Sequence, residues 1–335
     1  MRSIDDNAAA VDKSPGLLPE HLVDPRRRLL PIRPDQYSVQ IQTTTACNAH
    51  CSFCPHPTTW RTQPRRRMSD RVFDRILSQL RKYSLFKVCP YLQSEPLMDP
   101  QIFDRIGEIR RRLRFDVLEV STNPGALTPT RTARLLASVM GAPHEIRLSF
   151  HGVDPSSLRR AMGLEFESAV RNSVRLLKEA EAVGARVTIK GLGWARGPVR
   201  TNAPLFDEEG FTSFWRTLCA RNGLAFERIE IRYGAFHSRS DNVLRPNGSP
   251  ARLVRQGLEG FGCSRADRWF HFTHDADLIL CCNDYNREVV LGNVMDADLE
   301  EIVISEKYRS ILGQVSGRTA CPPDFICLRC SSPGG

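Results

Sequence analysis

Short runs in which hydrophobic and polar residues alternate recur along the chain from residue 37 to about residue 233. Each run is followed by a longer segment whose apolar residues lie three or four positions apart, as on one face of an α-helix. The first run, 37–43, predicts a strand, and 70–83 predicts a helix that Ser69 caps. The same patterns predict strands at 85–92, 115–120, 144–150, 186–192 and 228–233, and helices that begin at 99 or span 128–139, 167–183 and 211–222.

Strict alternation of strand and helix predicts a parallel sheet with right-handed crossovers. The fold class is therefore α/β, and six units make a partial (β/α)6 TIM-like barrel, fewer than the eight of a closed one. After about residue 241 the pattern changes to a predicted β-hairpin, 269–273 with 278–281, and a helix at 298–311. We expect three parts: a lead-in at 1–36, the barrel at 37–245 and a small C-terminal module at 262–335.

Three cysteines follow the first predicted strand: Cys47, Cys51 and Cys54. A short loop with this spacing can point all three sulfurs at one small object. Three thiolates can hold three irons of a [4Fe–4S] cube and leave the fourth iron open for chemistry. The alternatives are a structural zinc knuckle with His50 as fourth ligand, or three unconnected core cysteines.

This CxxxCxxC pattern, with the aromatic Phe53 before its third cysteine, resembles the radical S-adenosylmethionine (radical SAM) superfamily. The resemblance implies a [4Fe–4S] cluster on the three cysteines, with S-adenosylmethionine (SAM) bound to its open iron. It also implies SAM-binding residues in the loop and at successive strand ends, namely Phe53, Ser94, Glu95, Ser121, Asn123, Ser149 and Leu192. The family's amino-group turn carries a double glycine, in whose place this chain has Gln93 and Ser94.

A second set of cysteines lies in the module: Cys263, Cys281, Cys327 and Cys330. Four thiolates suffice to saturate a cube, and the closing CxxC is a compact two-ligand clip. The layout resembles the auxiliary-cluster extensions called SPASM and its shorter relative, twitch. In this family pattern a glycine precedes a ligand cysteine by five residues, and Ala276 in the glycine's place points to Cys281 rather than Cys282 as the ligand. Too few cysteines remain for two saturated clusters, so we expect one auxiliary [4Fe–4S] cluster. A four-thiolate zinc site is the alternative, and Cys282 or Cys321 could be spare or substitute as ligands.

The composition fits a globular metal-binding protein. The 335 residues are 41% hydrophobic and 25% charged, without an apolar run that could span a membrane or a signal-peptide stretch. Eleven cysteines without a secretion signal favour metal or iron–sulfur ligation in a reducing cytoplasm. The formal charge of +9 is typical of an arginine-rich solvated surface, or of attraction to an anionic partner such as a nucleotide, an acidic peptide or a reductant protein. No nucleic-acid motif is present, so nucleic acid is not an expected partner.

The resemblance implies that one electron enters the cluster and cleaves SAM, giving a 5′-deoxyadenosyl radical that removes hydrogen from an unactivated carbon. An auxiliary cluster near the substrate can accept a second electron, which favours an oxidoreductase. The chain is similar to twitch-type dehydrogenases that oxidise a secondary alcohol of an aminocyclitol in antibiotic biosynthesis. We expect a polar small-molecule substrate of the sugar or aminocyclitol class and an electron donor such as flavodoxin or ferredoxin. The hydroxyl proton needs a base, for which the candidates at the barrel mouth are His151, Lys190, Arg232, Tyr233, His237 and Tyr91.

Two other functions stay open. The first is modification of a ribosomally made peptide, which SPASM-type relatives also perform. Residues 1–36 cannot hold a peptide-leader domain, although such a domain can be a separate chain. The second is a non-catalytic iron–sulfur or zinc scaffold that binds a partner. Epimerisation is a variant of the alcohol chemistry, and it would use Cys89 or Cys219 as a hydrogen donor.

Overall fold

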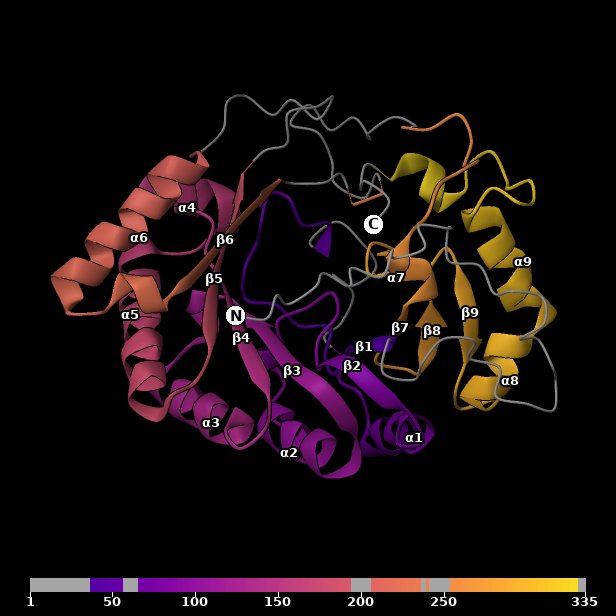
Figure 1. Cartoon of the computed structure of the whole chain (residues 1–335), viewed down its shortest axis with the longest axis horizontal. Coiled ribbons are helices and arrows are strands. Elements are labelled where there is room, and N and C mark those ends of the chain that lie inside the picture. Colours follow the sequence, from indigo (N-terminus) through magenta and orange to yellow (C-terminus); the bar gives the residue numbers. More distant parts are fainter. Residues whose placement is uncertain (1–36, 57–65, 194–205, 236–238, 241–253, 331–335) are drawn as a thin grey trace, which may run out of the picture.

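The computed structural model describes residues 37–56, 66–193, 206–235, 239–240 and 254–330. Within these residues, one nine-stranded sheet runs in the order β6-β5-β4-β3-β2-β1-β7-β8-β9 and curves around the centre of the molecule (Figure 1). The strands are β1 (Tyr37–Ile41), β2 (Ser84–Cys89), β3 (Arg114–Thr122), β4 (His144–Ser149), β5 (Val187–Gly193), β6 (Glu230–Ala235), β7 (Trp269–Phe272), β8 (Asp277–Ile279) and β9 (Val290–Asn293).

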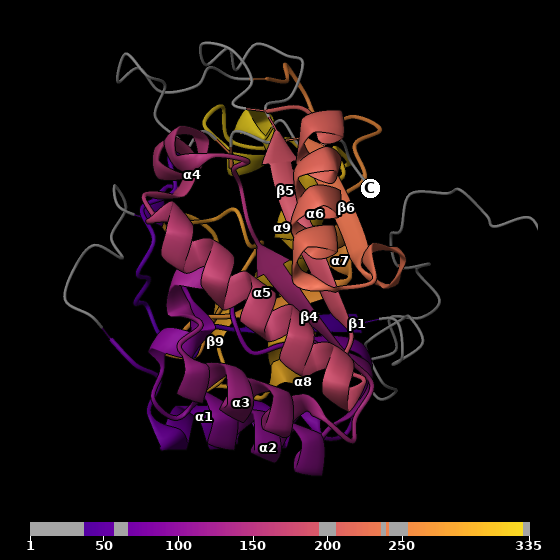
Figure 2. The same cartoon turned by 90° about the vertical axis from the view of Figure 1, so that its left-hand side faces the viewer.

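From β1 to β6 at least one helix lies between successive strands. The α-helices are α1 (Asp70–Leu80), α2 (Ile102–Arg112), α3 (Pro129–Val139), α4 (Pro155–Met162), α5 (Phe166–Val183), α6 (Glu208–Asn222), α7 (Ser264–Asp267), α8 (Leu299–Ile304) and α9 (Glu306–Val315). Helices α1, α2, α3, α5, α6, α8 and α9 cover the outside of the curved sheet, whereas α7 lies on its inner side (Figures 1 and 2). Single 3₁₀ turns lie at η5 (Pro96–Met98), η6 (Pro124–Ala126), η7 (Phe226–Arg228) and η8 (Ile326–Arg329).

Strands β1 to β6 pair in parallel along the sheet, each with its neighbour in sequence. The sheet does not close, because β6 and β9 stand at its two ends. The predicted α/β fold with a partial six-stranded barrel and a small C-terminal module is therefore confirmed. Buried aliphatic and aromatic side chains of the strands and of the facing helix stripes form one large core between the two layers.

The C-terminal module is joined to the barrel more closely than the predicted hairpin indicates. Strand β7 pairs in parallel with β1, so the barrel sheet continues directly into the module. The antiparallel pairs β7–β8 and β8–β9 then make a three-stranded meander. Helix α1 also holds the module, because Arg75 donates to the carbonyl of Val294 at 2.7 Å and to the carboxylate of Asp298 at 2.7 Å.

Two helical predictions need correction. Helix α4 lies where no helix was predicted; Asp154 closes a capping box at its start, and Gly163, with a φ of 66°, ends it. The single predicted helix at 298–311 is two helices, because Ser305 takes an extended conformation and caps α9 through a bond from Tyr308 N. No helix within the described residues has the length and hydrophobicity that a membrane span needs.

Candidate active site

The three-cysteine loop leaves β1 and is fixed on both sides. On one side it rests on the end of α4, where His50 N and Ser52 N each donate to a helix carbonyl at 3.0 Å. On the other side the side chains of Asn48 and Asn123 exchange hydrogen bonds at 2.9 and 3.3 Å. The unpredicted helix α4 therefore supports the loop that carries the cysteines.

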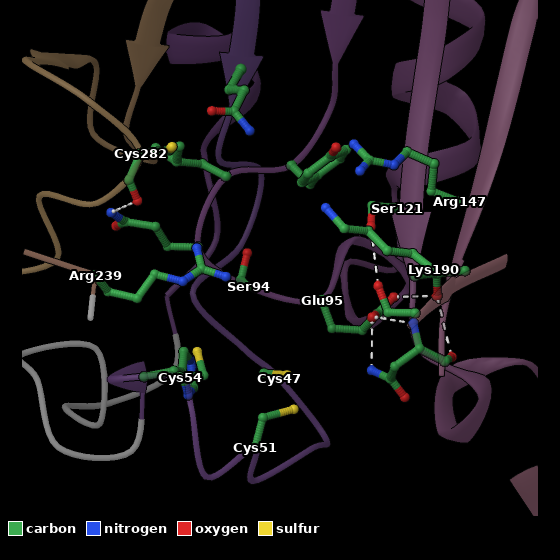
Figure 3. Close-up of a pocket in the computed structure, with 18 of the residues that line it drawn as sticks. Cys47, Cys51, Cys54, Ser94, Glu95, Ser121, Arg147, Lys190, Arg239 and Cys282 are labelled. Carbon is green, nitrogen blue, oxygen red and sulfur yellow. Dashed lines mark hydrogen bonds between the residues drawn. The ribbon is translucent and has the colours of Figure 1, made fainter. Parts of the chain in front are cut away.

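Cys47, Cys51 and Cys54 all line a cavity of about 540 Å³, which we call the central cavity. Figure 3 shows the three cysteines together at one end of it. His50, the fourth ligand of the zinc alternative, is exposed and does not line the cavity. Burial raises the pKa of Cys47 to about 12, so a thiolate here needs a compensating positive charge such as iron.

Glu95 lies beside the cysteine loop and caps the turn η5, which follows β2 (Figure 3). Its carboxylate accepts bonds from Thr122 Oγ1 at 2.6 Å, from Asn123 N at 2.9 Å and from Asn123 Nδ2 at 2.8 Å. Burial raises the pKa of Glu95 to about 7, against these bonds, which favour the ionised form. The carboxylate is thus held firmly in place within reach of a cationic or amino ligand.

The structure brings the predicted SAM-binding residues to the central cavity. All of them line it, namely Phe53, Ser94, Glu95, Ser121, Asn123, Ser149 and Leu192. The parallel strands end along one edge of the sheet, so their polar end residues meet there. Ser94 Oγ and His151 Nδ1 are buried and have no hydrogen-bond partner among the described residues, as expected where a polar ligand completes the site.

Gln93 explains why the chain departs from the family's double glycine. Its side-chain amide donates to the carbonyls of Cys282 at 2.9 Å and Asp284 at 3.1 Å. Asp284 in turn accepts bonds from Glu288 N and Val289 N, which close the loop after β8. A glycine here could not make this link, so Gln93 ties the turn after β2 to the module.

The predicted bases separate into three groups. Lys190, His151 and Tyr91 line the central cavity. Arg232 and Tyr233 do not line it, and these two predictions are not supported. Arg232 is held by Glu230 and Glu145 at the β6 edge of the sheet, and the hydroxyl of Tyr233 donates to Phe206 O at 2.8 Å. His237 lies outside the described residues.

The three cavity candidates differ in their acid–base properties. Burial and the charges of Arg147 and Arg239 lower the pKa of Lys190 to about 8. Burial lowers the pKa of His151 to about 3, and burial raises the pKa of Tyr91 well above its usual value. Only Lys190 therefore changes charge near neutral pH, as an effective proton acceptor should.

A charged group at the deep end of the cavity was not predicted. Glu119 on β3 pairs with Lys87 of β2 at 2.6 Å and with Arg147 of β4 at 2.7 Å, and Tyr91 donates to the same carboxylate. Burial alone would raise the pKa of Glu119, but the two cations outweigh it and lower the pKa to about 2. The sequence does contain a signal for two of these residues. Residues two apart on a strand share a face, and Glu119 and Arg147 precede the predicted cavity residues Ser121 and Ser149 by two positions.

The predicted auxiliary ligands also come together. Cys263, Cys281, Cys327 and Cys330 line a second, much smaller cavity in the module, which we call the auxiliary cavity. Its other walls are largely apolar and belong to a small separate core. Cys282 lines the central cavity instead, and Cys321 packs at the edge of the small core.

Neither cysteine set is arranged around a single metal ion. Among the described residues, no three His, Cys, Asp or Glu side chains lie close enough to hold one ion. A cube gives each thiolate its own iron and so holds its ligands further apart than one zinc ion does. Thiolate ligands at this larger separation are compatible with iron–sulfur cubes.

Comparison with known protein families gives two matches. A model of the radical SAM superfamily matches residues 41–194, and a model of the SPASM iron–sulfur cluster-binding domain matches residues 263–331. No curated protein matches the sequence.

Solved structures with the same fold include three relevant ones. BtrN in complex with AdoMet and 2-DOIA is 14% identical with a TM-score of 0.54, over 88% of this chain and 93% of that one. SuiB of Streptococcus suis bound to precursor peptide SuiA is 14% identical with a TM-score of 0.62, over 89% and 70%. Native anSMEcpe with bound AdoMet is 16% identical with a TM-score of 0.52, over 82% of both chains. At 14–16% sequence identity, these structures show that the chain shares their fold and nothing more specific.

Proposed function

Because the chain belongs to the radical SAM superfamily and carries a SPASM domain, we propose that it oxidises an alcohol group of a small polar molecule. The two domains imply SAM, a [4Fe–4S] cluster and auxiliary iron–sulfur cofactors. Cys47, Cys51 and Cys54 would hold the first cluster, and Cys263, Cys281, Cys327 and Cys330 one auxiliary cluster. When bound, SAM and the first cluster would supply the 5′-deoxyadenosyl radical that removes a hydrogen atom.

The proposal of alcohol oxidation depends mainly on one observation: the central cavity and the auxiliary cavity lie next to each other. Arg265 lines both cavities, and the consecutive residues Cys281 and Cys282 line one cavity each. A molecule in the central cavity would therefore lie next to the auxiliary cysteines. Such a neighbour can receive the second electron of an oxidation, whereas a distant cluster would serve only for electron transfer or structure.

Lys190 is our proposed base for the hydroxyl proton. It projects from β5 into the cavity between Ser121 and Arg239 in the view of Figure 3. Its ammonium has no hydrogen-bond or ion-pair partner among the described residues. With a pKa of about 8, a substantial fraction is neutral and ready to accept a proton in mildly alkaline solution.

Peptide modification is the second candidate. It is favoured by the higher TM-score with SuiB, whose structure holds a precursor peptide. The small-molecule reading is favoured by BtrN, of whose length this chain covers 93%. For alcohol oxidation, we further propose a sugar or aminocyclitol substrate and a role in antibiotic biosynthesis. The electron donor would be a flavodoxin or ferredoxin, and the location would be the cytoplasm.

A labelling experiment tests the oxidation. The anaerobically reconstituted enzyme is incubated with SAM, reductant and a candidate alcohol deuterated at the carbinol carbon. We expect deuterium in 5′-deoxyadenosine and one ketone formed for each SAM cleaved. A product that retains the oxidation state of the substrate would point to epimerisation, and label transfer only from a peptide would favour the second candidate; either result would reject alcohol oxidation.

A further inference from the structure

The walls of the central cavity carry more positive than negative charge. Two carboxylates line it, those of Glu95 and Glu119. Five cationic side chains line it as well, namely Lys87, Arg147, Lys190, Arg239 and Arg265. The cavity therefore keeps an excess of positive charge whether Lys190 is protonated or neutral.

Glu119 offsets part of the positive charge around Lys190, but neither carboxylate pairs with Lys190 or Arg265 among the described residues. Glu119 is used by Lys87 and Arg147 at the deep end, and Glu95 is bonded to Thr122 and Asn123 beside the cysteine loop. The cofactors would reduce this excess at most in part, since a [4Fe–4S]²⁺ cube on three thiolates carries one net negative charge and SAM carries at most one net positive charge. Among the described residues, no ion pair occupies Arg265.

Arg265 is the cation best placed to receive a ligand. It lies on α7, on the module side of the cavity, whereas Arg147 lies on β4 on the barrel side (Figure 1). Among the described residues, its guanidinium has no hydrogen-bond or ion-pair partner. Both arginines act electrostatically on Lys190, which places the ammonium within the field of both.

Arg147 also has donors to spare. One of its terminal nitrogens donates to Glu119 at 2.7 Å, whereas the other has no hydrogen-bond partner among the described residues. A guanidinium offers five donors in a planar fork that matches the oxygens of a carboxylate or phosphate. An anion between the two arginines would satisfy donors that the protein leaves unused.

We propose that the substrate carries a carboxylate or phosphate group, which Arg265 and Arg147 hold beside Lys190. This inference rests on the proposed function, because it places the reacting alcohol next to the base proposed there. It narrows the substrate class from any sugar-like alcohol to an acidic one, and it disfavours aminocyclitols, whose ammonium groups these cations would repel.

The test compares four sugars of similar size with different charge. Glucuronate, glucose 6-phosphate, glucose and glucosamine are titrated into the reconstituted, SAM-loaded enzyme by anaerobic calorimetry. We expect glucuronate or glucose 6-phosphate to bind at least about tenfold more tightly than the neutral and cationic sugars, the scale of charged hydrogen bonds. The tighter of the two anions identifies a carboxylate or a phosphate as the natural group.

Variants then assign the effect to the residue. Arg265→Gln should remove the preference for the anion, Arg265→Lys should restore part of it, and Arg228→Gln, which removes an exposed arginine, should leave it unchanged. Equal binding of all four sugars, or an unchanged preference in Arg265→Gln, would overturn the proposal. So would weaker SAM binding in Arg265→Gln with unchanged anion binding, because the arginine would then serve the carboxylate of SAM. SAM cleavage, measured on the same samples, reports separately on the radical chemistry.

Discussion

Cys281 and Cys282 are neighbours in the chain and line different cavities, the first the auxiliary cavity and the second the central cavity. The structure therefore separates a residue suited to hold the auxiliary cluster from one that is open to the substrate.

This arrangement predicts different outcomes for two similar substitutions. Cys281→Ala should lose the auxiliary iron, about half of the total if each cluster is a [4Fe–4S] cube. Cys282→Ala should keep all of it, because its side chain faces the other cavity. Iron and sulfide are measured after anaerobic reconstitution, with Cys219→Ala, a buried cysteine of α6, as control. If Cys282→Ala lost iron and Cys281→Ala kept it, Cys282 and not Cys281 would be the ligand of the auxiliary cluster.

A second prediction concerns the link between barrel and module. Gln93→Gly restores the family's glycine but removes the bonds to Cys282 O and Asp284 O. Leaving two buried carbonyls with fewer partners should cost about 1–3 kcal/mol of stability. The measurement is the shift in melting temperature. Gln256→Gly, at an exposed glutamine of the module, serves as control and should shift the melting temperature little. Equal shifts in the two variants would show that the link contributes nothing.

The proposed base predicts a pH dependence. The lowered pKa of Lys190 means that the ammonium loses its proton as the pH rises through about 8. The value of kcat/KM, which reports the free enzyme, should therefore rise between pH 7 and 9, earlier than an ordinary lysine would allow. Lys190→Met should lower the rate by about 10²- to 10⁴-fold while SAM still binds. A flat pH profile together with an active Lys190→Met enzyme would exclude this role.

The buried charged group at the deep end predicts a large loss of stability. Glu119→Gln leaves Lys87 and Arg147 without their shared partner inside the barrel, which should cost about 3–5 kcal/mol. Glu230→Gln removes a partly exposed carboxylate that pairs with Arg186 and Arg232, and it should cost about 1 kcal/mol or less. Thermal unfolding followed by circular dichroism compares the two. Similar small losses would mean that the group is hydrated rather than buried.

Much of the barrel could be predicted because period-two and helical patterns alternate so regularly. The residues at the strand ends, such as Glu95 and Ser149, could be located for the same reason, since parallel strands end along one edge. The pairing of β7 with β1 could not be predicted, because contacts between residues more than two hundred positions apart leave no local periodicity. Glu119 and Arg147 could have been located from their spacing of two from Ser121 and Ser149. Lys87 could not, because both faces of a barrel strand are covered and polarity alone does not show which residues point inward.

The central claim is that Cys47, Cys51 and Cys54 hold a cluster with an iron open to SAM. The most direct measurement is SAM cleavage by the anaerobically reconstituted and reduced protein. We predict methionine and 5′-deoxyadenosine in equal amounts, with the cleavage lost in Cys54→Ala although the auxiliary iron remains. Absence of cleavage in a protein that binds stoichiometric zinc at these three cysteines would contradict the account.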